Sequence, residues 1–367
     1  MTDLLKDMMN ERADGIGAPN LDVPAMVREG DQRATRRRNG VLGLVAAAAV
    51  VAGIAVPTLS LDRDTAREVE PASLFAGQQP SWAVGSTVHV GGEQIDVGRP
   101  VSELFVTTDG VVFTDERGTV YASDGTGTPE EIGAADRSFG SLVGDGSRAG
   151  WIEHEGGSAP VFVIYDQSTG ERQEADYDTA GQGATEYHPS LFAIDGDDAY
   201  LRDARGMIRW DLASGRQTLL GRPQGAEVAD VKSGVIAYTL PADDAGALVF
   251  AGRDFTGGTR LSLPPQDLTL NPSGTRLLGA GPGPSVGVVD TSTGELWPVT
   301  ASGYAHITPV AWVDDDTYAA VGSRPPTGPD QEDLLSCDVG DPSCTVLAAD
   351  FTEASESVVF SLGFPRR

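Results

Sequence analysis

The side chains in this sequence best suited to catalysis are one serine and four histidines. Ser285 lies in the segment 283–287, which matches the pattern G-x-S-x-G, but that pattern requires a strand before the serine and a helix after it. The residues that follow, 286–290, instead read as a strand. The histidines are scattered without i, i+4 pairing: His89, His154, His188 and His306. We therefore predict no catalytic residues and no cofactor, although distant segments can converge on one site.

Three acidic clusters are the candidates for metal binding. They occupy residues 195–198, 243–244 and 314–316. Each falls where a hairpin turn is expected, and aspartate is common in turns because its side chain accepts hydrogen bonds from nearby backbone N–H groups. Calcium needs several oxygen ligands from one loop, yet none of the clusters has the spacing of an EF-hand. We predict solvated turn residues and no metal site, with calcium binding as the alternative.

The only two cysteines, Cys337 and Cys344, are separated by six residues that include Gly340, Asp341 and Pro342. These intervening residues favour a tight turn, so the cysteines can face each other across a hairpin at a distance suited to a disulfide. Two sulfurs without a nearby histidine make a poor zinc site, which is the alternative. We predict a disulfide, which requires an oxidising compartment.

The formal net charge of the chain is −28, and it is unevenly distributed. Residues 1–56 contain 7 basic and 7 acidic residues, so the remainder of the chain carries the whole acidic excess. A domain with this charge repels phosphate backbones, which argues against nucleic-acid binding. A cationic partner or divalent ion is electrostatically easier to bind, and the simplest interpretation is that the charge keeps the domain soluble.

Residues 39–61 form an uncharged stretch of 23 residues rich in Ala and Val. A helix of about 20 apolar residues crosses the hydrocarbon core of a bilayer, so we predict one transmembrane helix. Basic residues cluster before it: Arg33, Arg36, Arg37 and Arg38. The positive-inside rule then places residues 1–38 in the cytoplasm and residues 62–367 outside. A cleaved signal peptide and a buried soluble helix are the alternatives.

The predicted cytoplasmic tail contains two short amphipathic patterns. Residues 3–12 and a segment that starts at Asp22 place apolar side chains at helical spacing. Neither segment can bury a core by itself, so each would be marginal as an isolated helix. We interpret the tail as a docking motif for a cytoplasmic partner. The alternative is a disordered tail whose arginines only fix the topology. Residues 62–83 would link the span to the large domain.

From residue 84 to residue 365 the sequence consists of short apolar runs broken by Gly, Asp, Ser or Pro, which is typical of many short strands. In a recurring unit, an apolar strand ends in aspartate and a tight polar turn follows. We assign these aspartates a structural role in accepting backbone N–H groups of the turn: Asp124, Asp166, Asp211, Asp254, Asp290 and Asp338. Successive copies are 42, 45, 43, 36 and 48 residues apart, a period typical of four-stranded propeller blades.

These repeats resemble those of WD40-like and TolB-like β-propellers. Trp210-Asp211 matches the dipeptide that names the WD40 group, and residues 270–278 are similar to a hairpin common to both groups. The Gly-His pair of WD40 repeats is absent, so the resemblance implies the architecture alone. The layout of basic tail, single span and acidic propeller also resembles actinobacterial envelope proteins of unassigned activity, some of which are associated with extracytoplasmic-function sigma factors.

The apolar runs predict six complete blades, near residues 101–133, 139–178, 189–221, 226–263, 267–300 and 307–350. A hairpin at Thr87–Val97 and a strand at Ser357–Leu362 remain, at opposite ends of the domain. Joining them builds a seventh blade and removes the open sheet edge of a linear array. The predicted fold is therefore all-β, a seven-bladed propeller, with six blades as the alternative.

Together these features predict a single-pass protein of the cell membrane. Its extracytoplasmic propeller would bind a ligand or protein, and its tail would engage a cytoplasmic regulator such as a sigma factor. We predict a binding or signalling module and not an enzyme. The alternatives are a propeller-based envelope enzyme, such as a hydrolase or lyase, and a purely structural tether.

Overall fold

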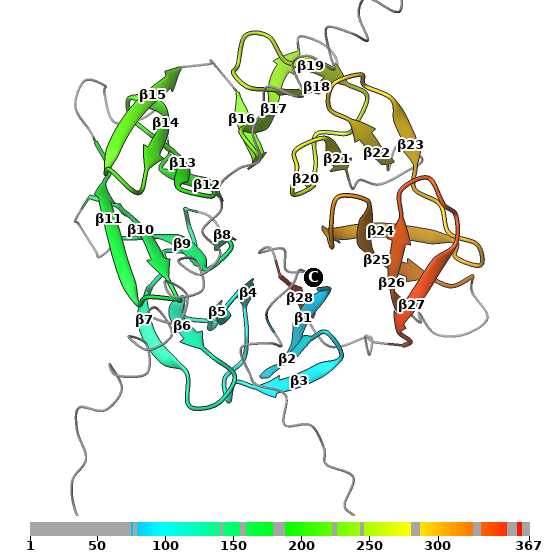
Figure 1. Ribbon diagram of the computed structural model, residues 1–367, viewed down its shortest axis with the longest axis horizontal. Helices are drawn as coiled ribbons and strands as arrows, with labels where there is room; N and C mark the ends of the chain where they lie inside the picture. The colour runs from blue at the N-terminus through cyan, green and yellow to red at the C-terminus, as the bar shows by residue number, and fades with distance from the viewer. Residues whose placement is uncertain are drawn as a thin grey trace, which may run out of the picture. The chain divides into compact units, whose positions relative to one another are not determined.

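The computed structural model describes residues 75, 79–139, 142–154, 159–178, 188–221, 226–242, 246–279, 287–325, 332–350 and 358–361. All regular elements in these segments are β-strands. They form seven four-stranded antiparallel sheets arranged as blades in a ring (Figure 1). The fold is an all-β seven-bladed propeller, as predicted, and the six-bladed alternative is wrong.

The strands of the first four blades are given from the centre of the ring outward. Blade 1 consists of β28 (Val358–Phe360), β1 (Ser81–Val84), β2 (Thr87–Val90) and β3 (Glu93–Asp96). Blade 2 consists of β4 (Glu103–Thr107), β5 (Gly110–Thr114), β6 (Thr119–Ser123) and β7 (Glu130–Ala134). Blade 3 consists of β8 (Val143–Asp145), β9 (Arg148–Glu153), β10 (Val161–Asp166) and β11 (Glu171–Asp176). Blade 4 consists of β12 (Ser190–Asp195), β13 (Asp198–Asp203), β14 (Gly206–Asp211) and β15 (Arg216–Gly221).

The other three blades follow the same order. Blade 5 consists of β16 (Glu227–Lys232), β17 (Val235–Ala242), β18 (Gly246–Gly252) and β19 (Thr259–Leu261). Blade 6 consists of β20 (Leu268–Leu270), β21 (Arg276–Gly279), β22 (Gly287–Asp290) and β23 (Leu296–Pro298). Blade 7 consists of β24 (His306–Trp312), β25 (Thr317–Ser323), β26 (Glu332–Asp338) and β27 (Cys344–Ala348). The six predicted complete blades correspond to blades 2–7.

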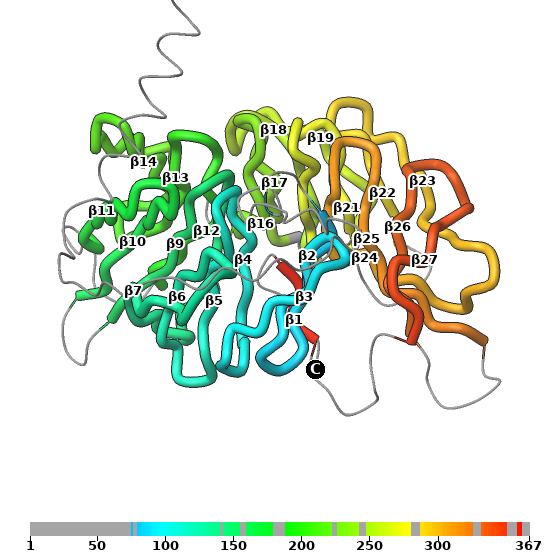
Figure 2. The backbone as a smooth tube through the Cα atoms, turned by 60° about the horizontal axis from the view of Figure 1, so that its bottom comes forward, coloured from blue at the N-terminus to red at the C-terminus, as the bar shows by residue number. Residues whose placement is uncertain are grey.

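Blade 1 closes the ring with strands from both ends of the propeller. β28 pairs antiparallel with β1, so that Trp82 lies opposite Phe360. Just beyond β28, Ser361 forms a parallel bridge to Leu104 of β4, and its hydroxyl accepts a hydrogen bond from the Val106 N–H at 3.1 Å. Figure 2 shows β28 in red beside the cyan strands β1 and β4. The predicted pairing of the two ends is confirmed, and β1 is the additional strand between them.

The hydrophobic core consists of seven clusters among the described residues, one between each pair of neighbouring blades. Side chains alternate across a strand, so each blade presents apolar residues to both neighbours. Trp210, which carries the WD40-like resemblance, is 3% exposed and belongs to the cluster between blades 3 and 4. Its role is therefore packing. The continuous series of clusters explains how short strands bury enough apolar area to form a closed ring.

The turns between the third and fourth strands of the blades, here called the outer turns, contain the repeated aspartates. In three of them the N–H of a glycine donates to the carbonyl of the aspartate four residues earlier, at 2.7, 2.8 and 2.9 Å: Gly170, Gly215 and Gly294. These glycines have φ of 72°, 72° and 76°, a left-handed conformation that favours glycine. The Asp290 carboxylate accepts hydrogen bonds from Ser292 Oγ at 2.6 Å and Thr293 N at 2.8 Å.

The disulfide prediction is confirmed. Cys337 on β26 is bonded to Cys344 on β27, directly opposite in the sheet register, with their Cα atoms 4.4 Å apart. Cys337 is fully buried in the cluster between blades 6 and 7. The bond fastens the outermost strand of blade 7, whose Val346 and Leu347 are exposed, to the buried part of the blade.

No helix within the described part of the chain is long and apolar enough to cross a membrane. The predicted tail (1–38), its arginines, the predicted span (39–61) and most of the linker (62–83) lie outside the described residues. So do Ser285 and the acidic cluster 243–244. The predictions that concern these segments therefore stay predictions.

Candidate functional site at the channel mouth

The inner turns, which connect the first and second strands of blades 2–7, are joined across blade boundaries by hydrogen bonds. A backbone N–H of one turn donates to a carboxylate of a neighbouring turn in four cases: Gly196 to Asp145 (3.0 Å), Ser233 and Gly234 to Asp195 (2.9 and 2.7 Å), and Ser273 to Asp315 (2.8 Å). The acidic clusters 195–198 and 314–316 do lie in hairpin turns, as predicted. The structure adds that Asp195 and Asp315 bridge blades, which gives the mouth of the central channel a fixed rim.

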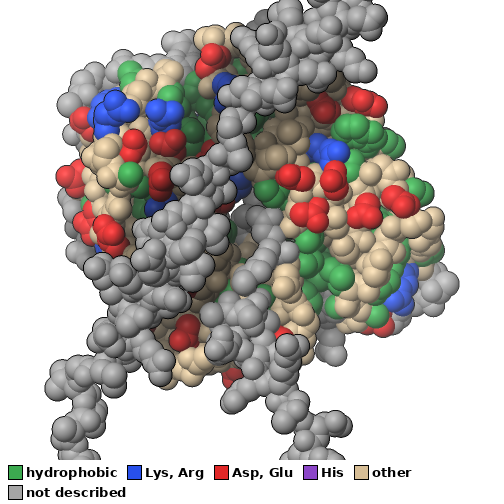
Figure 3. Space-filling model, in the orientation of Figure 1, with side chains coloured by type: hydrophobic (Ala, Val, Ile, Leu, Met, Phe, Trp, Pro, Cys, Tyr) green, Lys and Arg blue, Asp and Glu red, His purple; other side chains and the backbone are tan. Residues whose placement is uncertain are grey.

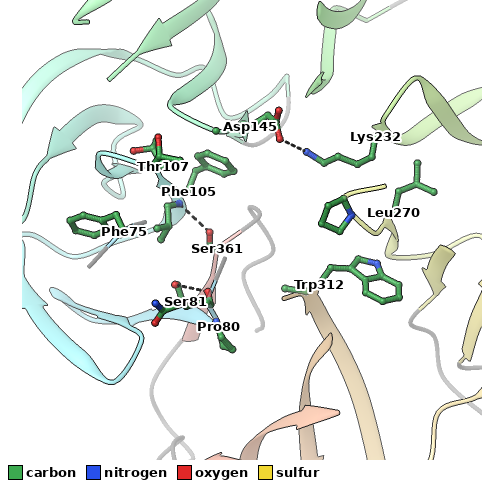
Figure 4. Close-up of a pocket in the computed structure, with 17 residues that line it drawn as sticks. Phe75, Pro80, Ser81, Phe105, Thr107, Asp145, Lys232, Leu270, Trp312 and Ser361 are labelled. Carbon is green, nitrogen blue, oxygen red and sulfur yellow. Dashed lines mark hydrogen bonds and ion pairs between the residues drawn. The ribbon is translucent and has the colours of Figure 1, made fainter. Parts of the chain in front are cut away.

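A cavity of about 430 Å³ opens at this rim (Figure 4). Its walls come from the innermost strands and inner turns of blades 2, 3, 5, 6 and 7, from residues 79–81 and Ser361 of blade 1, and from Phe75 before blade 1. Most of the wall is apolar or backbone, with Phe105, Leu270 and Trp312 among its side chains. The Trp312 indole N–H donates to the Thr269 carbonyl at 2.9 Å, which fixes the ring against blade 6. A volume of this size is typical of small-molecule pockets.

A second cavity of about 230 Å³ lies along the innermost strands of blades 2–6. The two cavities share four lining residues, namely Phe105, Gly144, Lys232 and Leu270. The register of β16 shifts between Val228 and Asp230, so Ala229 sits in a β-bulge, and a bulge redirects side chains. Ala229 and Asp230 both line this inner cavity.

An ion pair joins blade 5 to blade 3 where the two cavities meet. Lys232 Nζ, in blade 5, donates to Asp145 Oδ1, in blade 3, at 3.1 Å. Figure 4 shows the two side chains pointing toward each other. The Lys232 side chain is 17% exposed and that of Asp145 is 33% exposed. Because blade 4 separates the two residues, the pair depends on the curvature of the ring.

Asp230 is the second carboxylate beside Lys232. Its Oδ1 accepts the Val231 N–H at 2.7 Å, and its Oδ2 accepts the Leu270 N–H of blade 6 at 2.8 Å. Burial raises the pKa of Asp230, and the nearby Lys232 ammonium opposes that rise. Asp145 lines only the outer cavity, Asp230 lines only the inner cavity, and Lys232 lines both.

The repeated aspartates and the histidines singled out in the sequence do not assemble at this site, whereas Asp195 and Asp315 of the acidic clusters form part of its rim. The repeated aspartates lie at the ends of the third strands of blades 2–7, away from the innermost strands. His89 is stacked on Trp82 with ring centroids 4.7 Å apart, and burial lowers its pKa. His154 Nδ1 lies 3.1 Å from Asp136. None of the four histidines is among the lining residues of either cavity. Within the described residues, no group of three or more His, Cys, Asp or Glu side chains is placed to hold a metal ion.

The sequence does contain a signal for this site, although it belongs to no motif. The chain has only two lysines, Lys6 and Lys232, so Lys232 is the single lysine of the propeller. It also occupies the last position of an innermost strand, where blades 3 and 4 have Asp145 and Asp195. The sequence therefore shows that one lysine replaces an aspartate at this position of the repeat. It does not show which carboxylate pairs with that lysine.

No family model matches the chain, and no curated protein matches its sequence. Solved structures with a similar fold include the computationally designed Ika8 protein, with 16% identity, a TM-score of 0.45, and coverage of 80% of this chain and 96% of that one. TolB from Acinetobacter baumannii has 14% identity and a TM-score of 0.41 over 80% of this chain and 66% of that one. An oligogalacturonate lyase in complex with manganese has 15% identity and a TM-score of 0.45, covering 75% and 86%. At these identities the likeness concerns the propeller fold alone.

Proposed function

We propose that this protein is a membrane-anchored, extracytoplasmic binding module that recognises an extended peptide segment at the channel mouth, without catalysis. The observation that carries the proposal is the cavity of about 430 Å³ that the hydrogen-bonded inner turns hold open. Apolar walls supply contact area, and a few fixed polar groups supply orientation, which is the usual construction of a binding pocket. A preformed rim also lowers the entropic cost of binding.

The extracytoplasmic placement rests on other features. The disulfide between Cys337 and Cys344 suits an oxidising compartment. The uncharged stretch 39–61, preceded by four arginines, suits a single span with the tail inside. We propose that ligand binding outside is reported through residues 1–38 to a cytoplasmic regulator such as a sigma factor. Replacing that tail with an unrelated sequence should change transcription in response to the ligand, and an unchanged response would contradict the signalling role.

The binding proposal is tested by blocking the mouth. The full-length protein is used to select peptides from a random library, and the affinities of selected peptides are then measured for wild type and Thr108→Trp. Thr108 is an exposed residue of an inner turn that lines the cavity, so an indole there projects over the opening without entering a core. We expect affinity to fall about tenfold or more, the equivalent of about 1.4 kcal/mol.

The matched control is Thr218→Trp, which adds the same indole to an exposed position on the outermost strand β15. It should leave peptide affinity unchanged. Selected peptides that bind Thr108→Trp as tightly as wild type would place recognition elsewhere on the propeller and contradict the proposal. Failure to select any peptide would contradict it as well.

A further inference from the structure

The two adjacent cavities contain more carboxylates than ammonium groups. Their described lining residues include two carboxylates, Asp145 and Asp230, and one ammonium group, Lys232. The pair of cavities therefore has one negative charge that no lining cation balances when both carboxylates are ionised. Aromatic and aliphatic side chains form the surrounding walls, and an uncompensated charge is costly in such surroundings because water is partly excluded. A ligand that brings one positive charge removes this cost, and an anionic ligand increases it.

The geometry allows such a cation to enter. Asp145 is the more exposed partner of the ion pair, and it lies in the outer cavity. Its other oxygen, Oδ2, is held by the Gly196 N–H, so the carboxylate stays in place when its cation is exchanged. Lys232 has a flexible four-carbon stem and already lines the inner cavity, where Asp230 lies.

We propose that the channel mouth selects a basic side chain, a lysine or arginine of the bound peptide, which replaces Lys232 at Asp145 while Lys232 turns toward Asp230. The proposal rests on the proposed binding function and names the chemistry of its ligand. The apolar walls formed by residues such as Phe105, Leu270 and Trp312 suit the methylene stem of a basic side chain, which packs against apolar surface while its charged end is paired.

The test uses a selected peptide that Thr108→Trp weakens, synthesised with lysine, arginine, norleucine or glutamate at the position that contributes most to binding. With wild-type full-length protein, the lysine and arginine forms should bind about tenfold tighter than the norleucine form, because a charge-assisted hydrogen bond is lost in the latter. The glutamate form should bind most weakly.

Two substitutions should change the affinity for the lysine peptide in opposite directions. Asp145→Asn keeps an oxygen that accepts the Gly196 N–H but removes the charge, and it should abolish the preference for lysine over norleucine. Lys232→Met removes the competing ammonium and should tighten binding of the lysine form. A merely structural role for the pair would weaken binding in both variants. The control is Asp176→Asn, which makes the same charge change at an exposed position of the outermost strand β11, outside both cavities.

A spectroscopic measurement keeps the test decisive even where a variant folds poorly. Reductive ¹³C-methylation of the wild-type chain labels only Lys6, Lys232 and the terminal amine, and Lys232→Arg assigns the Lys232 signal. Adding the lysine peptide should shift that signal, and the norleucine peptide should leave it in place. Equal affinity of the lysine and norleucine peptides, with binding still sensitive to Thr108→Trp, would overturn this inference and leave the binding function standing. Binding that is insensitive to Thr108→Trp would overturn both.

Discussion

Asp333 on β26 is a fully buried carboxylate that holds three segments of blade 7 together. It accepts hydrogen bonds from Arg324 Nε and Nη2 at 2.8 and 2.6 Å, from the Tyr304 hydroxyl at 2.7 Å and from the Asp350 N–H at 3.0 Å. These partners lie before β24, after β25 and after β27. A buried charge is tolerated when it is paired and all its lone pairs are used, and Asp333 meets both conditions.

The substitution Asp333→Asn keeps the shape of the side chain and removes the charge that Arg324 faces. Because the asparagine replaces one acceptor oxygen by an NH₂ donor that would face the donors of Arg324, Tyr304 and Asp350, we expect the free energy of unfolding to fall by about 1 to 3 kcal/mol. Chemical denaturation at neutral pH measures this loss. Asp341→Asn, at the exposed turn between β26 and β27, is the control and should be nearly neutral. Equal stability of the two variants would show that the network of Asp333 contributes little.

The hydrogen bonds of the outer turns predict how the stability of the protein depends on pH. Hydrogen bonds from the Ser292 hydroxyl and the Thr293 N–H lower the pKa of Asp290 below its ordinary value of 3.8. A carboxyl whose pKa is depressed by folding stabilises the protein above that ordinary value, and this contribution is lost as the pH falls through the folded-state pKa. Asp290→Ala should therefore cost about 1 kcal/mol at pH 7 and progressively less below pH 3.8. Unfolding measured at both pH values tests this, and a difference that stays constant with pH would contradict the assignment.

At the residue scale, the sequence predicts local hydrogen bonding better than distant pairing. Each repeated aspartate precedes its own turn, so a partner such as Ser292 for Asp290 is only two residues away. Lys232 and Asp145 are 87 residues apart, and their contact depends on how two blades and the intervening one curve. Sequence spacing alone does not predict that curvature.

At the scale of elements, removal of β28 is the simplest change that should open the ring. Its three residues are all buried, and they form the innermost strand of blade 1. A chain that ends before Val358 should leave an edge of β1 unpaired and expose apolar surface on blades 1 and 7. We expect a lower unfolding temperature and self-association, measured by thermal unfolding and light scattering.

The matched control for this truncation ends after Ser361 and keeps β28 together with the bridge to Leu104. It should behave as the full chain does. A truncated chain without β28 that remains monomeric and equally stable would show that closure does not depend on this strand.

The blade boundaries were predictable because each blade is a local series of hairpins with turn residues at regular intervals. The strand β1 was not predicted, because Ser81–Val84 is short and lies before the first clear hairpin. The register shifts in β12, β16 and β24 were also not predictable. A bulge depends on how an innermost strand fits against its neighbours, and it determines that Asp230 lines the channel.

For the whole molecule, the main prediction is topological. On the face shown in Figure 3, acidic side chains are more common than basic ones, consistent with the excess of Asp and Glu outside residues 1–56. If residues 39–61 span the membrane, the full-length chain should remain in the membrane fraction after alkaline washing. Protease added to spheroplasts should then digest the propeller and spare residues 1–38. Deletion of residues 39–61 is the control and should release the protein from the membrane.

A soluble exported form that lacks residues 1–61 would instead support a cleaved signal peptide, and protection of the propeller from external protease would contradict the predicted orientation. The charge distribution bears on the partner too. A propeller with a strongly acidic surface attracts basic peptides over several ångströms and repels nucleic acid, and both effects weaken as salt rises.

The origin of β28 at the far end of the propeller sets an order of events during synthesis. β1, β2 and β3 are made first, yet their blade lacks its innermost strand until the last residues of the domain are available. Blades 2–7 can form their own hairpins as they emerge, whereas the ring closes only when β28 is available. An incomplete product therefore has an open edge, and the binding that we propose at the channel mouth becomes possible only in this final step.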